Sequence, residues 1–161
     1  MDIFKQHQRG IVPSIEVHKR YKEVIGMYNK HLEREEFLPA YLIILSLFEE
    51  RVSICTFLLY WYDLSKTFDK DRKPTTQEIQ DYFTRGVGGK ITYIRQKNFI
   101  TKKEKERSIE VLKNRNNIVH GYIWNHDKVT QEDCDKVYKW FRVFDKSSLE
   151  IKKSLEFEKY N

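Results

Sequence analysis

The chain has 161 residues, of which 40% are hydrophobic and 34% are charged. This balance argues against a disordered chain and predicts one globular domain that is large enough to bury its own core. Glycine and proline are scarce, so the domain should be mostly helical. The net charge of +6 suits a polyanionic partner such as a nucleic acid.

The two cysteines, Cys55 and Cys134, form neither a disulfide framework nor the spacing of a metal site. The first residues of the sequence are polar and lack the apolar segment of a signal peptide. We therefore expect a cytoplasmic protein with reduced cysteines and no cofactor.

The first helix is expected from Ser14, a suitable N-cap, to about residue 32. Residues 38–64 form the most apolar segment and should be a long, buried central helix. Charged residues at 49–51 interrupt this segment, so we do not expect it to span a membrane.

Polar residues of the central helix gather on one stripe, which includes Glu49 and Glu50. This stripe should face a cleft, another subunit or solvent. Arg51 falls among apolar residues instead, where an unpaired guanidinium would be costly. The sequence leaves open whether Arg51 reaches solvent or pairs with a carboxylate.

A short helix at 77–84 and another at 91–99 are expected next, separated by the glycine-rich segment 85–90. The glycine and lysine spacing of this segment does not fit a phosphate-binding loop, so we predict a turn between helices. A capping-box pattern, Thr101 with Glu104, then predicts the start of a lysine-rich helix.

Gly121 is placed to end this lysine-rich helix. Two more helices are expected, from Thr130 to about Phe144 and from 147 to 160. No linker divides the chain. We predict a single all-α domain over residues 1–161, with the parts 1–37 (N-terminal helix), 38–145 (core) and 146–161 (C-terminal helical tail).

The segment from Lys113 to Tyr122 holds the residues that point to chemistry. Arg115 supplies a forked cation suited to phosphate oxygens, and His120 supplies a base whose ordinary pKa is about 6.5. These groups suffice for RNA cleavage by the 2′-hydroxyl: a base takes the 2′ proton, a cation stabilises the phosphorane, and an acid protonates the 5′-oxygen. No metal or protein nucleophile is needed.

Helix geometry limits how one copy of this segment could work. Arg115 and His120 are five positions apart and project about 140° away from each other on a regular helix. Asn116 and His120 share a face. Either the last turn before Gly121 is distorted, or two copies of the segment meet across a twofold axis.

The pattern Arg115-x4-His120, with Asn116 after the arginine and Gly121 after the histidine, resembles the signature of the HEPN superfamily. Such proteins are all-α domains, commonly dimeric, and many are metal-independent ribonucleases of toxin–antitoxin, CRISPR and antiphage systems. Tyr122 extends the resemblance to HepT-type toxins, whose nucleotidyltransferase antitoxin adenylylates that tyrosine.

The resemblance implies catalytic roles for Arg115 and His120, a supporting polar role for Asn116, and modification of Tyr122. Several HEPN ribonucleases also use an acidic residue from an earlier helix. The further site candidates are therefore the acidic residues Glu49 and Glu50 and the RNA-contacting residues Arg107, Lys113 and Asn114.

These expectations predict a homodimeric endoribonuclease that acts on RNA without metal in a toxin–antitoxin or antiphage system. Its partner would be a nucleotidyltransferase antitoxin or another defence protein. The alternative is a non-catalytic HEPN-like module that binds a partner protein or a nucleic acid. A DNA-binding regulator is less favoured because no helix-turn-helix pattern with a basic recognition helix occurs.

Overall fold

The computed structural model describes residues 14–67, 85–121 and 128–158, and nothing in this part of the chain is a strand. Its helices are α2 (Ser14–Glu33), α3 (Phe37–Thr67), α5 (Val87–Gln96), α6 (Lys102–His120) and α8 (Gln131–Glu158). The prediction of an all-α helical bundle is confirmed. The helix expected at 77–84 lies outside the described residues.

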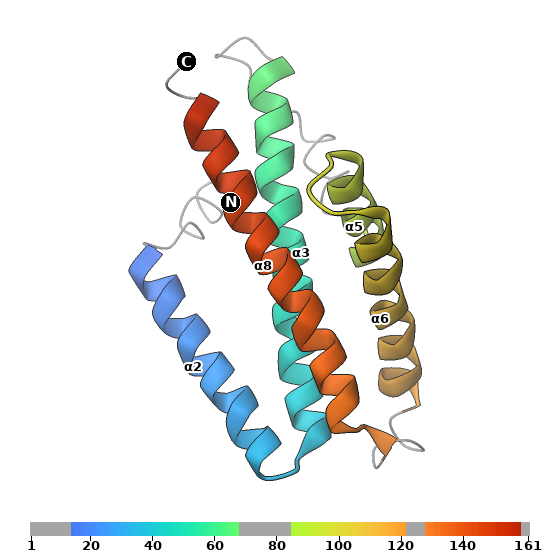
Figure 1. The fold of residues 1–161 in the computed structure, drawn as a ribbon. Coiled ribbons are helices and arrows are strands. Elements are labelled where there is room, and N and C mark those ends of the chain that lie inside the picture. The colour runs from blue at the N-terminus through green and yellow to red at the C-terminus, as the bar shows by residue number, and fades with distance from the viewer. Residues whose placement is uncertain (1–13, 68–84, 122–127, 159–161) are drawn as a thin grey trace, which may run out of the picture.

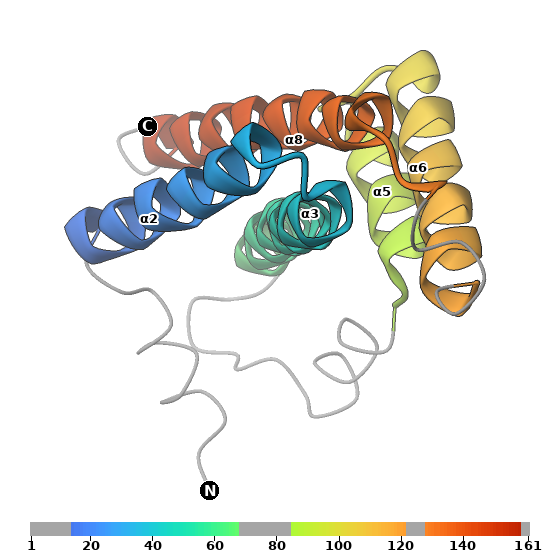
Figure 2. The ribbon, with the colours of Figure 1, turned by 90° about the horizontal axis from the view of Figure 1, so that it is seen from below.

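Helix α3 is the central element of the bundle (Figure 1). It packs most extensively against α8, and also against α2 and α5. Helix α6 lies on the outer side of α5 and also contacts α8, as the view from below shows (Figure 2). No helix among the described residues is long and apolar enough to cross a membrane.

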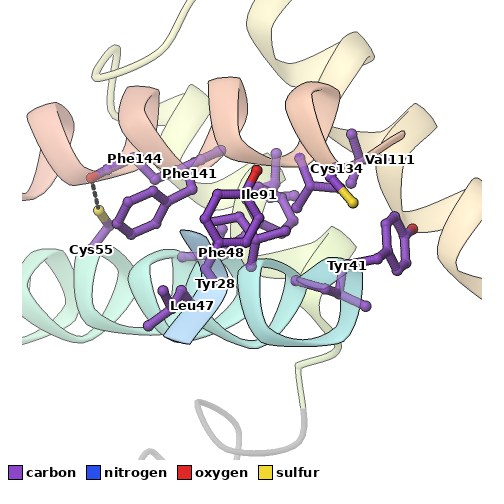
Figure 3. Close-up of a cluster of buried hydrophobic side chains, with 14 of the residues drawn as sticks. Tyr28, Tyr41, Leu47, Phe48, Cys55, Ile91, Val111, Cys134, Phe141 and Phe144 are labelled. Carbon is purple, nitrogen blue, oxygen red and sulfur yellow. Dashed lines mark hydrogen bonds between the residues drawn. The ribbon is translucent and has the colours of Figure 1, made fainter. Parts of the chain in front are cut away.

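The core forms where α3 meets α8 (Figure 3). Because α3 is apolar on nearly all sides, it can be enclosed by several neighbours at once. Phe48 of α3 is fully buried and meets Phe144 of α8 edge to face, with ring centroids 5.6 Å apart. The predicted long buried central helix is therefore confirmed, and it extends to Thr67.

Arg51 pairs with a carboxylate, which settles the choice that the sequence left open. Its Nε lies 3.1 Å from Oδ1 of Asp145 on α8, close enough for an ion pair although not aligned as a hydrogen bond. The guanidinium also covers the ring of Tyr21 from α2, 4.0 Å from the ring centroid. One mostly buried cation thus links three helices.

Both cysteines are free and buried. The Cys55 thiol donates to the carbonyl oxygen of Phe144, and the Cys134 thiol to that of Phe37, each at 3.3 Å. Burial raises the pKa of both thiols to about 12. They therefore behave as small core side chains rather than as nucleophiles.

The helix boundaries in the C-terminal part of the chain differ from the sequence prediction. Helix α8 is continuous from Gln131 to Glu158, so the division into a helix ending at Phe144 and a separate tail was wrong. Ser147 and Ser148, at the start of the expected tail, are both buried within α8, and the Ser147 hydroxyl donates to the Phe99 carbonyl oxygen at 3.2 Å. Tertiary packing outweighs their weak helix preference here.

The glycine-rich segment is mostly helix rather than the predicted turn. Helix α5 begins at Val87 with Gly86 as its N-cap, so Gly88 and Gly89 lie in its first turn. A Cβ on Gly88 would lie 3.4 Å from Cδ1 of Ile109 on α6. A Cβ on Gly88 would therefore lie at the near limit of van der Waals contact with α6.

Gly89→Ala should stabilise the protein. A Cβ at this position would meet only the Cβ of Arg85, at an ordinary 3.8 Å, and alanine favours the helix. We expect the free energy of unfolding to rise by about 0.5–1 kcal/mol in urea titrations. Gly88→Ala is the matched comparison and should gain less, because its Cβ contacts α6. A lower stability for Gly89→Ala would contradict the helical start of α5.

Candidate functional site

Helix α6 carries the segment that the sequence singled out. It begins with the predicted capping box: the Glu104 amide donates to the Thr101 hydroxyl at 3.2 Å, and the Thr101 amide donates to the Glu104 carboxylate at 2.6 Å. It ends at the predicted Gly121, whose amide donates to the Asn117 carbonyl oxygen at 3.0 Å. Both predicted ends are confirmed, and the segment from 113 to 120 is helical.

Arg115 meets a residue from a different helix. Its Nη2 lies 3.3 Å from Oε1 of Glu49 on α3, and its Nη1 donates to the amide oxygen of Asn116 at 3.2 Å. The Arg115 and Glu49 side chains are 36% and 27% exposed, so the pair lies at a partly open surface. The structure thus brings together three of the predicted site residues.

Glu50 points to another part of the molecule. It accepts a hydrogen bond from the Tyr21 hydroxyl of α2 at 3.2 Å, beside the Arg51 ion pair. Adjacent residues on a helix project about 100° apart, so Glu49 and Glu50 serve different neighbours. Of the two acidic candidates, Glu49 lies with Arg115 and Glu50 does not.

Lys90 is a site residue that the sequence analysis missed. It lies in the first helical turns of α5, and its Nζ donates to the Ser53 hydroxyl of α3 at 3.1 Å. Burial lowers the pKa of Lys90, and the Glu49 carboxylate partly opposes this shift. Glu49 and Ser53 are four positions apart on one face of α3, so this face presents a carboxylate and a hydroxyl to two cations.

The glycines that precede Lys90 were visible in the sequence, but they predicted the wrong local structure. The glycines at 86, 88 and 89 predicted a turn, and a lysine at the end of a turn has no fixed direction. Only the packing of α5 against α3 gives Lys90 its position.

The remaining predicted residues are spread over the surface of α6. Lys113 and Asn114 are exposed. Arg107 is also exposed and forms an ion pair with Glu110 at 2.9 Å, one turn along the helix. In the described part of the chain, none of these three residues forms a hydrogen bond or an ion pair with Arg115 or Glu49.

The orientation of His120 relative to Arg115 stays a prediction. His120 is the last residue of α6, but its side chain lies outside the described residues, as does the whole of Tyr122. Within residues 14–67, 85–121 and 128–158, no group of three His, Cys, Asp or Glu side chains could hold a metal ion.

Comparison of the chain with known proteins gives no further guide. No protein-family model matches it, and neither the curated proteins nor the solved structures yield a match. The chemistry of the site therefore has to be argued from its own residues: two cations, Arg115 and Lys90, flank one carboxylate, Glu49, next to the end of a helix that carries a histidine.

Proposed function

We propose that the protein is a metal-independent endoribonuclease of the HEPN type. The observation that carries this proposal is the 3.3 Å pairing of Arg115 with Glu49. Arg115 belongs to the motif, and Glu49 is one of the two acidic candidates, Glu49 and Glu50, on an earlier helix. Their meeting is what a composite site of this type requires, and the all-α bundle is compatible with it.

In this proposal Arg115 stabilises the charge of the pentavalent phosphorane, because its fork can bind two phosphate oxygens. Glu49 attracts the guanidinium through an ion pair that is not aligned as a hydrogen bond, and the amide oxygen of Asn116 accepts a hydrogen bond from it. Lys90 adds a second cation close to the same carboxylate. His120 takes the 2′ proton or delivers a proton to the 5′-oxygen.

The proposal includes a homodimer. Five positions separate Arg115 from His120, and side chains at this spacing on a regular helix project about 140° away from each other. A twofold axis next to the end of α6 would place the His120 of one copy near the Arg115 of the other. The exposed Val119 lies on this end of α6, where a dimer contact would bury it.

The biological setting belongs to the same proposal. A cytoplasmic toxin–antitoxin or antiphage system would supply the RNA target and a partner that restrains the nuclease. A nucleotidyltransferase antitoxin that adenylylates Tyr122 is the partner that the HepT resemblance suggests. Exposed basic residues of α6, such as Lys113, would attract the RNA backbone, and this attraction weakens steeply with salt.

The test is cleavage of a structured RNA in the presence of EDTA. We expect the wild-type protein to cut it and to leave 2′,3′-cyclic phosphate and 5′-hydroxyl ends. The double variant Arg115→Ala/His120→Ala should leave the RNA intact. Cleavage that EDTA abolishes, or that survives in the double variant, would rule out the proposed mechanism.

A non-catalytic RNA-binding module is the second candidate, and one observation favours it. The guanidinium of Arg115 is already engaged by Glu49 and by Asn116, so its charge is partly neutralised before any substrate arrives. A binding module would retain the RNA in a gel-shift experiment but would release no cleaved product. The same RNA and the same buffers distinguish the two candidates.

A further inference from the structure

The ammonium group of Lys90 has a fixed position next to the candidate site. Lys90 lies near the start of α5, which packs between α3 and α6 (Figure 2). Its backbone amide donates to the Gly86 carbonyl oxygen at 3.1 Å and so belongs to the first helical turn. Its half-buried side chain reaches α3, where Nζ donates to the Ser53 hydroxyl at 3.1 Å.

The Ser53 hydroxyl is oriented to accept this proton. It donates its own hydrogen to the Glu49 carbonyl oxygen at 3.0 Å, so its lone pairs are available to the Lys90 ammonium. Glu49 and Ser53 are four positions apart, which is about 6 Å along the axis of α3. The guanidinium of Arg115 lies 3.3 Å from the Glu49 carboxylate. One face of α3 thus holds a cation from α5 and a cation from α6, about one helical turn apart.

Local preference does not favour a lysine at this position. The first turn of α5 has no acidic residue, and its N-cap, Gly86, has no side chain that could accept an amide proton. The positive end of the helix dipole disfavours a cation here. Partial burial of the ammonium disfavours it as well. A residue that opposes its local environment in this way is expected at a functional site rather than at a purely structural one.

The surroundings of Lys90 also favour release of its proton. Burial lowers the pKa of Lys90 below the ordinary lysine value of 10.5, and the Glu49 carboxylate of α3 partly opposes this shift. On the side of α6, the side chains nearest to the first turn of α5 are Ile109 and Leu112, which carry no charge. A lysine with a lowered pKa is a more effective general acid at neutral pH than an exposed lysine.

Two tyrosine hydroxyls near the site are poor alternatives as proton donors. Tyr41 is only 1% exposed, so its hydroxyl is closed to a substrate. The Tyr93 hydroxyl, one turn beyond Lys90 on α5, donates its proton to the Asp63 carboxylate. Among the described residues that reach the surface beside the Arg115–Glu49 pair, Lys90 carries a proton that it can release.

On the basis of the ribonuclease function proposed above, we propose that Lys90 is the general acid that protonates the departing 5′-oxygen. The 2′-oxygen forms the new bond to phosphorus, and the bond from phosphorus to the 5′-oxygen breaks with its electron pair on that oxygen. The 5′-oxygen takes a proton from the Lys90 ammonium, while His120 takes the 2′ proton. Lys90 then regains a proton from water and His120 releases one, so the protein is unchanged after one turnover.

A substrate with a sulfur leaving group tests this role. Lys90→Ala should lower the rate on ordinary RNA by about 10²- to 10⁴-fold, the usual contribution of a general acid. A thiol has an ordinary pKa of about 8.5, so a thiolate departs without a proton. RNA in which sulfur replaces the bridging 5′-oxygen, at the linkage that the wild type cuts, should therefore be cleaved by Lys90→Ala at close to the wild-type rate. A variant that is merely damaged would be slow on both substrates.

Lys90→Arg separates the proton from the charge. Arginine keeps a cation at this position but does not release a proton in proteins. Lys90→Arg should therefore be as slow as Lys90→Ala on ordinary RNA and fast on the sulfur substrate. Lys152→Ala is the matched control, because Lys152 is exposed on α8, and it should act as the wild type does on both substrates. A wild-type rate of Lys90→Arg on ordinary RNA would overturn the proposal.

Acetylation of the wild-type protein shows whether Lys90 meets the substrate, without any cleavage. Mass spectrometry measures the acetylation of each lysine with and without a 2′-O-methyl oligoribonucleotide, which cannot be cut through its 2′-oxygen. Lys90 should react in the free protein and be protected at least several-fold by the oligoribonucleotide. Lys152 should react equally in both samples. A Lys90 that does not react in the folded protein, or that reacts equally with and without the oligoribonucleotide, would contradict contact with the substrate.

The outcomes distinguish this inference from the ribonuclease proposal on which it rests. Cleavage by the wild type that is lost in Arg115→Ala/His120→Ala but kept in Lys90→Ala leaves the ribonuclease proposal intact and overturns the role of Lys90. Equal slowing of Lys90→Ala on ordinary RNA and on the sulfur substrate also overturns only that role. Absence of cleavage by the wild type overturns both.

Discussion

Arg115→Ala should lower the rate of RNA cleavage by about 10²- to 10³-fold, the usual effect of removing one group that stabilises transition-state charge. The expected loss is in kcat, because the phosphorane carries more charge than the ground-state phosphate. Arg115→Lys should retain part of the rate, since the charge remains but the forked pair of donors is lost. Initial rates on one RNA, with EDTA present, measure all three proteins.

The folded state should tolerate Arg115→Ala. The Arg115 and Glu49 side chains are both partly exposed, and ion pairs of this kind contribute at most about 1 kcal/mol. Arg142→Ala is a suitable control because Arg142 is exposed on α8 and is not one of the candidate site residues, so its removal should leave the rate unchanged. Wild-type cleavage by Arg115→Ala would show that Arg115 is not catalytic and would favour the binding module.

Glu49 positions Arg115 in the proposed mechanism, so its substitution should change the pH–rate profile as well as the rate. Glu49→Gln keeps the size of the side chain but releases the charge that holds Arg115. The same change removes the group that opposes the lowering of the Lys90 pKa. Loss of activity in this variant should therefore be accompanied by a shift of the alkaline limb of the pH–rate profile to lower pH, which a purely structural defect would not produce.

The sequence alone predicted the helices correctly where local signals and burial agree. The ends of α6 followed from a capping box and a terminal glycine, and α3 followed from an apolar segment that only a core could accept. It failed where packing opposes local preference. Gly88 lies in the first turn of α5, which packs against α6, and Ser147 lies within α8, where its hydroxyl donates to the Phe99 carbonyl oxygen. Neither contact is visible from one segment alone.

The same limit applies to the candidate site. The helical wheel placed Glu49 and Glu50 on one polar stripe, but only the tertiary arrangement shows that one faces α6 and the other faces α2. Lys90 could not be predicted as a site residue for the same reason, because its position depends on how α5 packs on α3. Residue types and spacing identify candidates on one helix, whereas a composite site depends on the contacts between helices.

The second large effect is expected for the core between α3 and α8. Phe48 is fully buried, and its ring packs edge to face on Phe144. Phe48→Ala removes this buried ring and leaves a cavity, because close-packed neighbours relax only in part. The free energy of unfolding should fall by about 3–5 kcal/mol. That is a large part of the total stability of about 5–15 kcal/mol that is usual for a domain.

Urea unfolding followed by circular dichroism measures this loss, and Leu42→Ala is its control. Leu42 lies on the same helix but is 42% exposed, so its removal leaves no closed cavity and should cost much less than the loss of Phe48. The variant Phe144→Ala completes a double-mutant cycle, and the two rings should be coupled by about 0.5–1.5 kcal/mol. Equal losses for Phe48→Ala and Leu42→Ala would mean that α3 is not enclosed as described. Additive losses for the two phenylalanines would mean that the ring contact itself adds no stability beyond burial.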